Sequence, residues 1–227
     1  MKALLNKELK LCTPLQVPLF FVFAAMLLIP SYPYLVAGFF ICNAVFYSFA
    51  MSTGQNDVMF SVLLPVSKKD IVRGKLTYVV CIQLVSMLLF AGMVFVNHAM
   101  YKDVINRGGT TASITLLAFY LLLYSVFNAV YIPGYFKAPH KFGIRFLKAL
   151  IACFAVILIC EGVMAASANA EGVAAFDFIR RYLNVFPTDT AALVCQLITL
   201  AVCVAVYAVT NVLVCKKAAS NFEKLDI

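Results

Sequence analysis

The chain has 227 residues, of which 64% are hydrophobic and only 12% are charged, and its mean hydropathy is +0.96. Soluble domains contain about 45–50% apolar and about 25% charged residues. The composition therefore excludes a water-soluble fold and predicts an all-α polytopic membrane protein with one transmembrane domain over residues 1–227. The formal charge of +8 lies in short clusters between apolar runs, which indicates membrane orientation and not nucleic-acid binding.

Six apolar runs are candidates for helices that cross the bilayer. Crossing about 30 Å of hydrocarbon takes roughly 20 apolar residues, and we predict spans at 15–29, 34–53, 77–98, 112–132, 148–168 and 190–214. The first is short, contains Pro18, and ends in Pro30-Ser31-Tyr32-Pro33 without a signal-peptide cleavage site. We therefore keep it as the first span. Because the two prolines of the turn remove backbone donors and stop a helix, we expect the first and second spans to form a hairpin.

The basic residues are distributed unevenly between the two sides of the membrane. Fourteen of the eighteen Lys and Arg residues precede the first span, follow the sixth, or lie in residues 54–76 and 133–148. Because cytoplasmic segments are enriched in Lys and Arg, we expect both termini in the cytoplasm. The external loop 169–189 mixes aromatic residues with Asp177, Arg180 and Arg181, a pattern that fits a short amphipathic helix or an ordinary ordered loop equally well.

The cytoplasmic loop 54–76 has the most informative local pattern. Its apolar and charged residues can be interpreted as two short helices, the first ending at Pro65. Ser67 suits the N-cap of the second, and Asp70 occupies the capping-box position where Glu is more usual. The alternative is a solvated loop whose lysines only set the topology.

The stretch Leu64-Pro65-Val66-Ser67-Lys68-Lys69-Asp70-Ile71-Val72-Arg73-Gly74-Lys75 resembles a motif of one transporter family. Permease subunits of bacterial type-2 ATP-binding-cassette (ABC) exporters, including small peptide exporters, have such a motif between spans two and three. The six spans, the basic N-terminal segment and an external helical element match that family's layout as well. Asp70 departs from it, because a longer acidic side chain is common there.

This resemblance implies that the 54–76 loop contains a coupling helix that docks in a groove of a cytoplasmic ATPase. The apolar residues of the loop would fill the groove and its cations would pair with acidic groups at the rim. Carried over to this sequence, the docking residues are Asp57, Phe60, Leu63, Leu64, Pro65, Lys68, Lys69, Asp70 and Arg73. The implied assembly has two ATPase subunits and a second permease copy, or a related permease, in a bacterial plasma membrane.

The sequence has no signature of catalysis or cofactor binding. It has no GxxxxGK[ST] phosphate loop, no HExxH and no GxSxG, so ATP and Mg²⁺ are expected in the partner ATPase and this chain is not expected to be an enzyme. The eight cysteines lack the spacing of a zinc site, so we predict no metal and interpret them as small buried hydrophobes.

Four polar residues inside predicted spans are candidates for a substrate pathway. Glu161 is the sole carboxylate well inside a span, where an unpaired charge costs several kcal/mol. It is interpreted either as a pathway or gating residue or as a hydrogen-bond partner between helices. Asn43, Gln83 and Asn128 have the same two interpretations.

The resemblance favours ATP-driven export of a peptide or another amphipathic, lipid-like substrate. Two alternatives remain open from the sequence. One is an ATP-independent secondary transporter or channel in which Glu161 responds to an ion. The other is a membrane immunity protein that sequesters a peptide.

Overall fold

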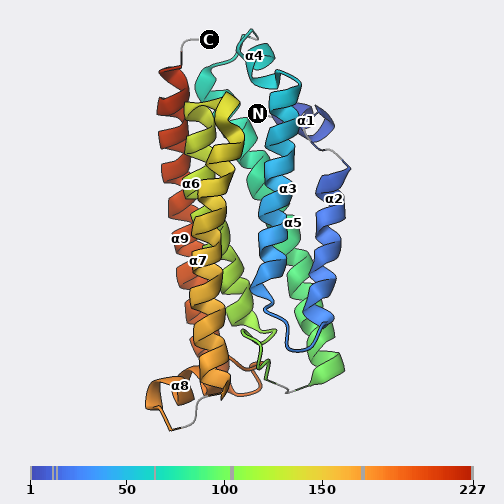
Figure 1. Ribbon diagram of the computed structural model, residues 1–227, viewed down its shortest axis with the longest axis vertical. Helices are drawn as coiled ribbons and strands as arrows, with labels where there is room; N and C mark the ends of the chain where they lie inside the picture. Colours follow the sequence, from blue (N-terminus) through green and yellow to red (C-terminus); the bar gives the residue numbers. More distant parts are fainter. Residues whose placement is uncertain are drawn as a thin grey trace.

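The computed structural model describes residues 2–11, 13, 15–63, 65–102, 105–169 and 172–225. Over these residues the chain is helical between its turns and contains no strand. The long helices lie side by side along one axis (Figure 1). The prediction of an all-α polytopic membrane protein is confirmed, and the reason is that helices satisfy their own backbone groups where lipid offers no partner.

Five helices of the described chain are long and apolar enough to cross a bilayer. They are α3 (Leu35–Gly54), α5 (Lys68–Tyr101), α6 (Ile114–Lys137), α7 (Phe142–Asn169), which follows the 3₁₀ turn η2 (Pro139–Lys141), and α9 (Thr190–Glu223). They correspond to the predicted spans from 34–53 onward. The 34 residues of α5 rise about 51 Å, so this helix extends well beyond the hydrocarbon.

The predicted first span is shorter than the others. The five α-helical residues of α2 (Gln16–Phe20) continue into the eight 3₁₀ residues of η1 (Phe21–Leu28). At about 1.5 and 2.0 Å per residue the segment reaches about 24 Å, less than the about 30 Å of hydrocarbon. The turn that contains Ser31 then joins it to α3, against which both α2 and η1 pack in the predicted hairpin.

The prediction of two short helices in the 54–76 loop is wrong in its second half. A short helix, α4 (Asp57–Val62), is present, but Ser67 caps α5 itself, which continues without a break into the next span. The Ser67 hydroxyl accepts a hydrogen bond from the backbone N–H of Asp70 at 3.1 Å, which confirms the N-cap. The helix continues because residues 68–101 contain no proline to stop it.

An aromatic stripe on α6 forms the centre of the bundle. Its members recur every three or four residues and therefore share one buried face of the helix: they are Tyr120, Tyr124, Phe127, Tyr131 and Tyr135. The Phe49 ring of α3 packs edge-on against two of them, at ring-centre distances of 5.2 and 4.6 Å. Each aromatic pair contributes about 0.5–1.5 kcal/mol, which matters because lipid removes the hydrophobic drive for helix association.

The two ends of the bundle differ. One end, here called the basic end, has α1 (Lys2–Leu11), α4, η2 and the end of α9 (Figure 1). The opposite end, here called the α8 end, has α8 (Ala174–Phe178) and the π-helical turn η3 (Ile179–Leu183). A short helical element therefore forms in the 169–189 loop. Of the two alternatives that the sequence left open there, a short helix and an ordinary loop, the structure has the helix.

A polar network joins three long helices inside the bundle. The side-chain amides of Gln83 on α5 and Asn128 on α6 exchange two hydrogen bonds, at 2.9 and 3.0 Å. Asn128 also donates to Asn211 of α9 at 3.0 Å, and the Tyr207 hydroxyl of α9 donates to Gln83 at 2.6 Å. The network holds α5, α6 and α9 in one register.

Replacing Asn128 by Leu should lower the stability of the detergent-solubilised protein by about 1–2 kcal/mol, because the Gln83 amide loses its reciprocal partner. Thermal unfolding measures the effect. The control is Asn43→Leu, since Asn43 bonds only the Phe39 carbonyl of its own helix among the contacts described. Equal melting temperatures for the two variants would contradict this role of the network.

Candidate functional site

Four charged side chains form a closed ring at the basic end. Lys7 and Glu8 come from α1, Asp57 begins α4, and Lys75 lies near the start of α5. The distances between charged atoms are 2.7 Å for Lys7–Asp57 and 3.3 Å for Lys7–Glu8, Lys75–Glu8 and Lys75–Asp57. The four side chains are at most 13% exposed. Because the signs alternate, each buried charge has two opposite neighbours, and this pairing offsets the cost of desolvation.

Hydroxyl groups extend the charge ring to a fourth helix. Ser52 of α3 donates to the Asp57 carboxylate at 3.0 Å and accepts a hydrogen bond from the Lys75 ammonium. The Lys7 ammonium also donates to the Ser61 hydroxyl of α4 at 2.6 Å. The ring therefore ties α1 to the three consecutive elements α3, α4 and α5, although α1 is more than twenty residues away from them along the chain.

Asp57 is ionised in this environment. Burial alone would raise the pKa of its carboxyl, but the charge of Lys75 and the charge and hydrogen bond of Lys7, with that of Ser52, lower it below its usual value. The sequence assigned Asp57 to a docking surface. The structure places its side chain inside the protein, where it fixes the start of α4.

The end of α4 and the turn that follows it form an apolar tip that faces outward. The side chain of Phe60 is 57% exposed and that of Leu63 is 83% exposed. Pro65 and Val66 beside them are also exposed, and Leu64 lies outside the described residues. The predicted groove-filling residues that the structure describes thus share one exposed apolar tip.

The three predicted rim cations differ in their contacts. Lys69 and Arg73 are exposed, and Arg73 lies 3.6 Å from the Asp70 carboxylate. Lys68 instead donates to the backbone carbonyl of Leu225 at 2.7 Å, and its ammonium lies 5.7 Å from the ring centre of Phe222 on α9. Lys68 therefore attaches the start of α5 to the end of α9.

Glu161 lies near the α8 end, where its side chain joins three segments. Its carboxylate accepts hydrogen bonds from the backbone N–H of Leu35 at 2.5 Å and of Thr110 at 2.6 Å. Leu35 is the first residue of α3, so the carboxylate satisfies a free N–H at the positive end of that helix. A Cβ at Gly109 would collide with the carboxylate, so glycine is needed for this approach. These contacts agree with the interpretation of Glu161 as a hydrogen-bond partner that joins segments of the bundle.

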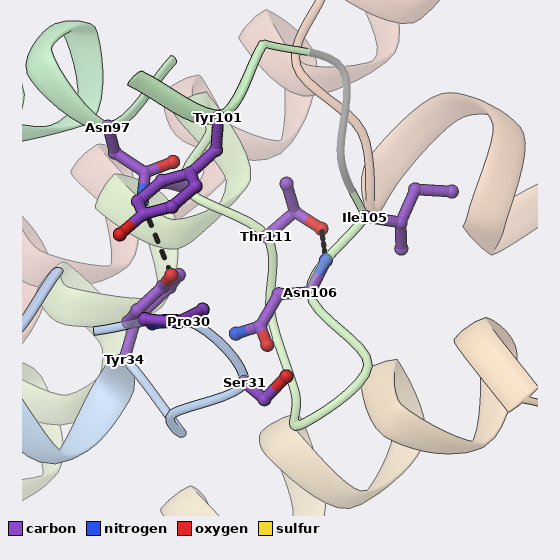
Figure 2. A pocket seen from close by; sticks show the side chains of 9 residues that line it. Pro30, Ser31, Tyr34, Asn97, Tyr101, Ile105, Asn106 and Thr111 are labelled. Atoms are coloured by element: carbon purple, nitrogen blue, oxygen red, sulfur yellow. Dashed lines mark hydrogen bonds between the residues drawn. The ribbon is translucent and has the colours of Figure 1, made fainter. Parts of the chain in front are cut away.

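The structure brings together only two of the four candidate pathway residues. Gln83 and Asn128 meet in the polar network, whereas Asn43 bonds within its own helix and Glu161 lies at the α8 end. A cavity of about 50 Å³ at that end lies beside Tyr34, Asn97, Tyr101, Asn106 and Thr111 (Figure 2). It has room for a few water molecules and is too small for a peptide.

Three members of the charge ring escaped the sequence analysis: Lys7, Glu8 and Lys75. Lys7 was counted only as a charge that sets orientation, and Lys75 only as that and as the last residue of the motif. One signal was available, because Glu8 is the sole acidic residue before Asp57. An acid in an otherwise basic N-terminal segment indicates an ion pair with a particular cation, but the sequence does not show which cation that is.

The fold and this site define a class of protein: a polytopic helical membrane protein with an exposed helical tip braced by buried charges. The chain belongs to the ABC-2 family of transporters, since the family model described as ABC-2 family transporter protein matches residues 3–217. It is thus the membrane component of an ABC transporter and works with an ATP-binding ATPase component. No curated protein and no solved structure matches the chain.

Replacing Lys7 by Met should release α1 from the bundle. Removing one member of a buried ionic cluster leaves its partners uncompensated, which costs about 3 kcal/mol. Amide hydrogen exchange in residues 2–11 should therefore become about 100-fold faster. The control is Lys10→Met, because Lys10 is exposed on the same helix and makes no ion pair within the described residues. Unchanged exchange in the Lys7 variant would refute the bracing role.

Acid should release α1 in the same way. Because the pKa of Asp57 is lower in the folded protein than its ordinary value of 3.8, the carboxylate contributes its full stability above that value and loses it as the pH falls further, through the lower pKa of the folded state. Protection factors of α1, measured from about pH 5 down to about pH 2, should fall in the native chain. In an Asp57→Asn variant they should already be low at the higher pH, and a native chain with a flat profile would contradict the assignment.

Proposed function

We propose that this chain is the permease subunit of an ATP-driven exporter and that the apolar tip at the end of α4 docks on its ATPase. The ATPase, a separate chain, binds ATP and Mg²⁺. The exported substrate is a peptide or another amphipathic, lipid-like molecule. The observation that carries this proposal is the exposure of Phe60 and Leu63 on a helix whose base is fixed by the buried charge ring.

The charge ring supports a mechanical role for α4. With six residues, α4 is too short to be stable by itself, but Asp57 holds its first turn to Lys75 of α5 and Lys7 of α1. A force applied at Phe60 would therefore move α1, α3, α4 and α5 together. Rigid movement of packed elements is a common way of transmitting such a change, and here it would shift α3 and η1 against α7.

The bias of basic residues supports the orientation. The basic end contains α1, the 54–76 loop, η2 and the end of α9, and these segments have most of the Lys and Arg residues. By the positive-inside rule this end faces the cytoplasm, where the ATPase is found. The membrane is the plasma membrane of a bacterium.

A pathway between two permease copies agrees with the packing inside one chain. The polar side chains of Gln83 and Asn128 are buried and bonded to each other, and the cavity at the α8 end holds only water-sized molecules. Neither feature offers a passage to a peptide. We therefore propose that one chain is half of a transporter and pairs with a second copy or a related permease.

Exchanging Phe60 and Leu63 for Asp together should weaken co-purification of the ATPase at least about tenfold, because apolar anchors dominate such interfaces. Reversing Lys69 and Arg73 to Glu should weaken it further at low salt, where paired rim charges matter most. The matched control is Phe178→Asp, since Phe178 is 50% exposed but lies in α8 at the opposite end.

Three outcomes would count against the proposal. If the Phe60/Leu63 variant binds the ATPase as well as the native chain does, the apolar tip is not the docking site. Transport without a co-expressed ATPase, and a loss of its proton dependence in Glu161→Gln, would favour the secondary transporter. Protection from a peptide without any transport would favour the immunity protein.

A further inference from the structure

The hairpin formed by the end of α6, η2 and the start of α7 is strongly basic. It contains Lys137, Lys141, Arg145 and Lys148, together with His140, and residues 133–160 contain no acidic residue. Four fixed positive charges therefore lie within twelve residues of one another at the basic end, with no opposite charge of their own.

The cations of this hairpin have no partner elsewhere in the described part of the chain. None of the four takes part in an ion pair or a side-chain hydrogen bond there, and the Arg145 Nε is buried without a hydrogen-bond partner. The cations beside α4 are different: Lys7 and Lys75 belong to the charge ring, and Arg73 pairs with Asp70. Most cations beside α4 are thus paired within the chain, with the exposed Lys69 as an exception, whereas those of the hairpin are not.

The exposed face of α7 fixes the depth of the hairpin in the membrane. The large apolar side chains exposed along it are Ile144, Leu147, Ile151, Phe154, Leu158, Ile159 and Val163. From the first to the last of these the helix rises about 28 Å, which matches the about 30 Å thickness of the hydrocarbon. Ile144 therefore marks the boundary between the acyl chains and the headgroups at the basic end.

The lysines lie within one helical turn of that boundary. Lys148 follows Ile144 by four residues and so shares its face of α7, and Lys141, the last residue of η2, precedes Ile144 by three. Both lysines are exposed, as is Lys137 at the end of α6. A lysine stem can lie along apolar surface while its ammonium reaches the headgroup layer, so the charges of Lys141 and Lys148 can both reach that layer.

We propose that this hairpin binds the headgroups of anionic phospholipids in the leaflet at the basic end. The lipid phosphates supply the negative charge that the chain lacks there, and the acyl chains cover Ile144 and Ile151. Bound lipid would fix the depth of the α6–α7 hairpin in that leaflet. The inference requires only that the chain is embedded in a membrane and does not depend on ATPase docking.

The depth of the hairpin favours lipid over the acidic surface of a protein. The α6–α7 turn lies nearer the middle of the bundle than α4 does (Figure 1). A partner seated on α4 would lie beyond the headgroups, whereas Lys141 and Lys148 flank a residue at the edge of the acyl chains. Lipid is the negatively charged partner found at that level.

A single tryptophan can report the lipid at this face, because the chain contains none of its own. The Ile144→Trp protein is reconstituted in phosphatidylcholine vesicles that contain brominated phosphatidylglycerol or brominated phosphatidylcholine in equal amount. Each headgroup-level cation contributes about fivefold to anionic lipid binding. The relative binding constant of phosphatidylglycerol over phosphatidylcholine at position 144 should therefore be about five or more, and inorganic phosphate should not lower it.

Exchanging Lys137, Lys141 and Lys148 for Gln in the Ile144→Trp protein should bring this relative constant to about one. Neutralising Lys69 and Arg73, two exposed cations beside α4, should leave it unchanged. A Leu158→Trp reporter, on the same face but about 21 Å farther along α7, should show no preference for phosphatidylglycerol.

Four results would overturn the inference. They are a relative constant of about one at position 144, a preference that survives loss of the three lysines, loss of the preference when inorganic phosphate is added, and an equal preference at position 158. If the triple variant instead loses the ATPase while its lipid preference is intact, the basic hairpin is a protein-docking surface. Since the Phe60/Leu63 variant tests docking separately, failure of one proposal does not decide the other.

Discussion

Burying charge at the edge of a membrane protein is costly, and the charge ring meets that cost by pairing every charge with two others. Its members come from three helices, and Ser52 brings in a fourth. Removing Lys7 would leave both Glu8 and Asp57 short of a partner. The same reciprocity gives the short α4 a fixed base and keeps Phe60 directed outward.

Three further buried polar side chains support the opposite end and the centre in a similar way. Glu161 joins α7 to the start of α3 and to the 105–113 loop, and Gln83 with Asn128 joins α5 to α6. In the sequence these side chains are candidates for a substrate pathway, because polar groups are rare in membrane spans. Their bonds inside one chain favour structural roles, and they leave the proposed pathway to the boundary between two permeases.

Cations at the basic end have two different uses. Lys7 and Lys75 are enclosed and neutralised by acids of the same chain, which makes their half of the bundle stiff. Lys141 and Lys148 lie on the surface without such acids, and their charge is available to the membrane. A count of Lys and Arg along the sequence cannot separate these uses, because it records sign and position but not enclosure.

The sequence by itself determined the spans from 34–53 onward and the Ser67 cap, because each depends on hydrophobicity or on neighbours within a few residues. Only the tertiary structure decided where Asp57 and Glu161 point. Asp57 meets Lys7 across 50 positions and Glu161 meets Leu35 across 126. Such contacts arise from packing of whole helices, which also decided that the first apolar segment is partly 3₁₀ and that α5 extends from Lys68 without interruption. No local pattern encodes which distant helix face a side chain will meet.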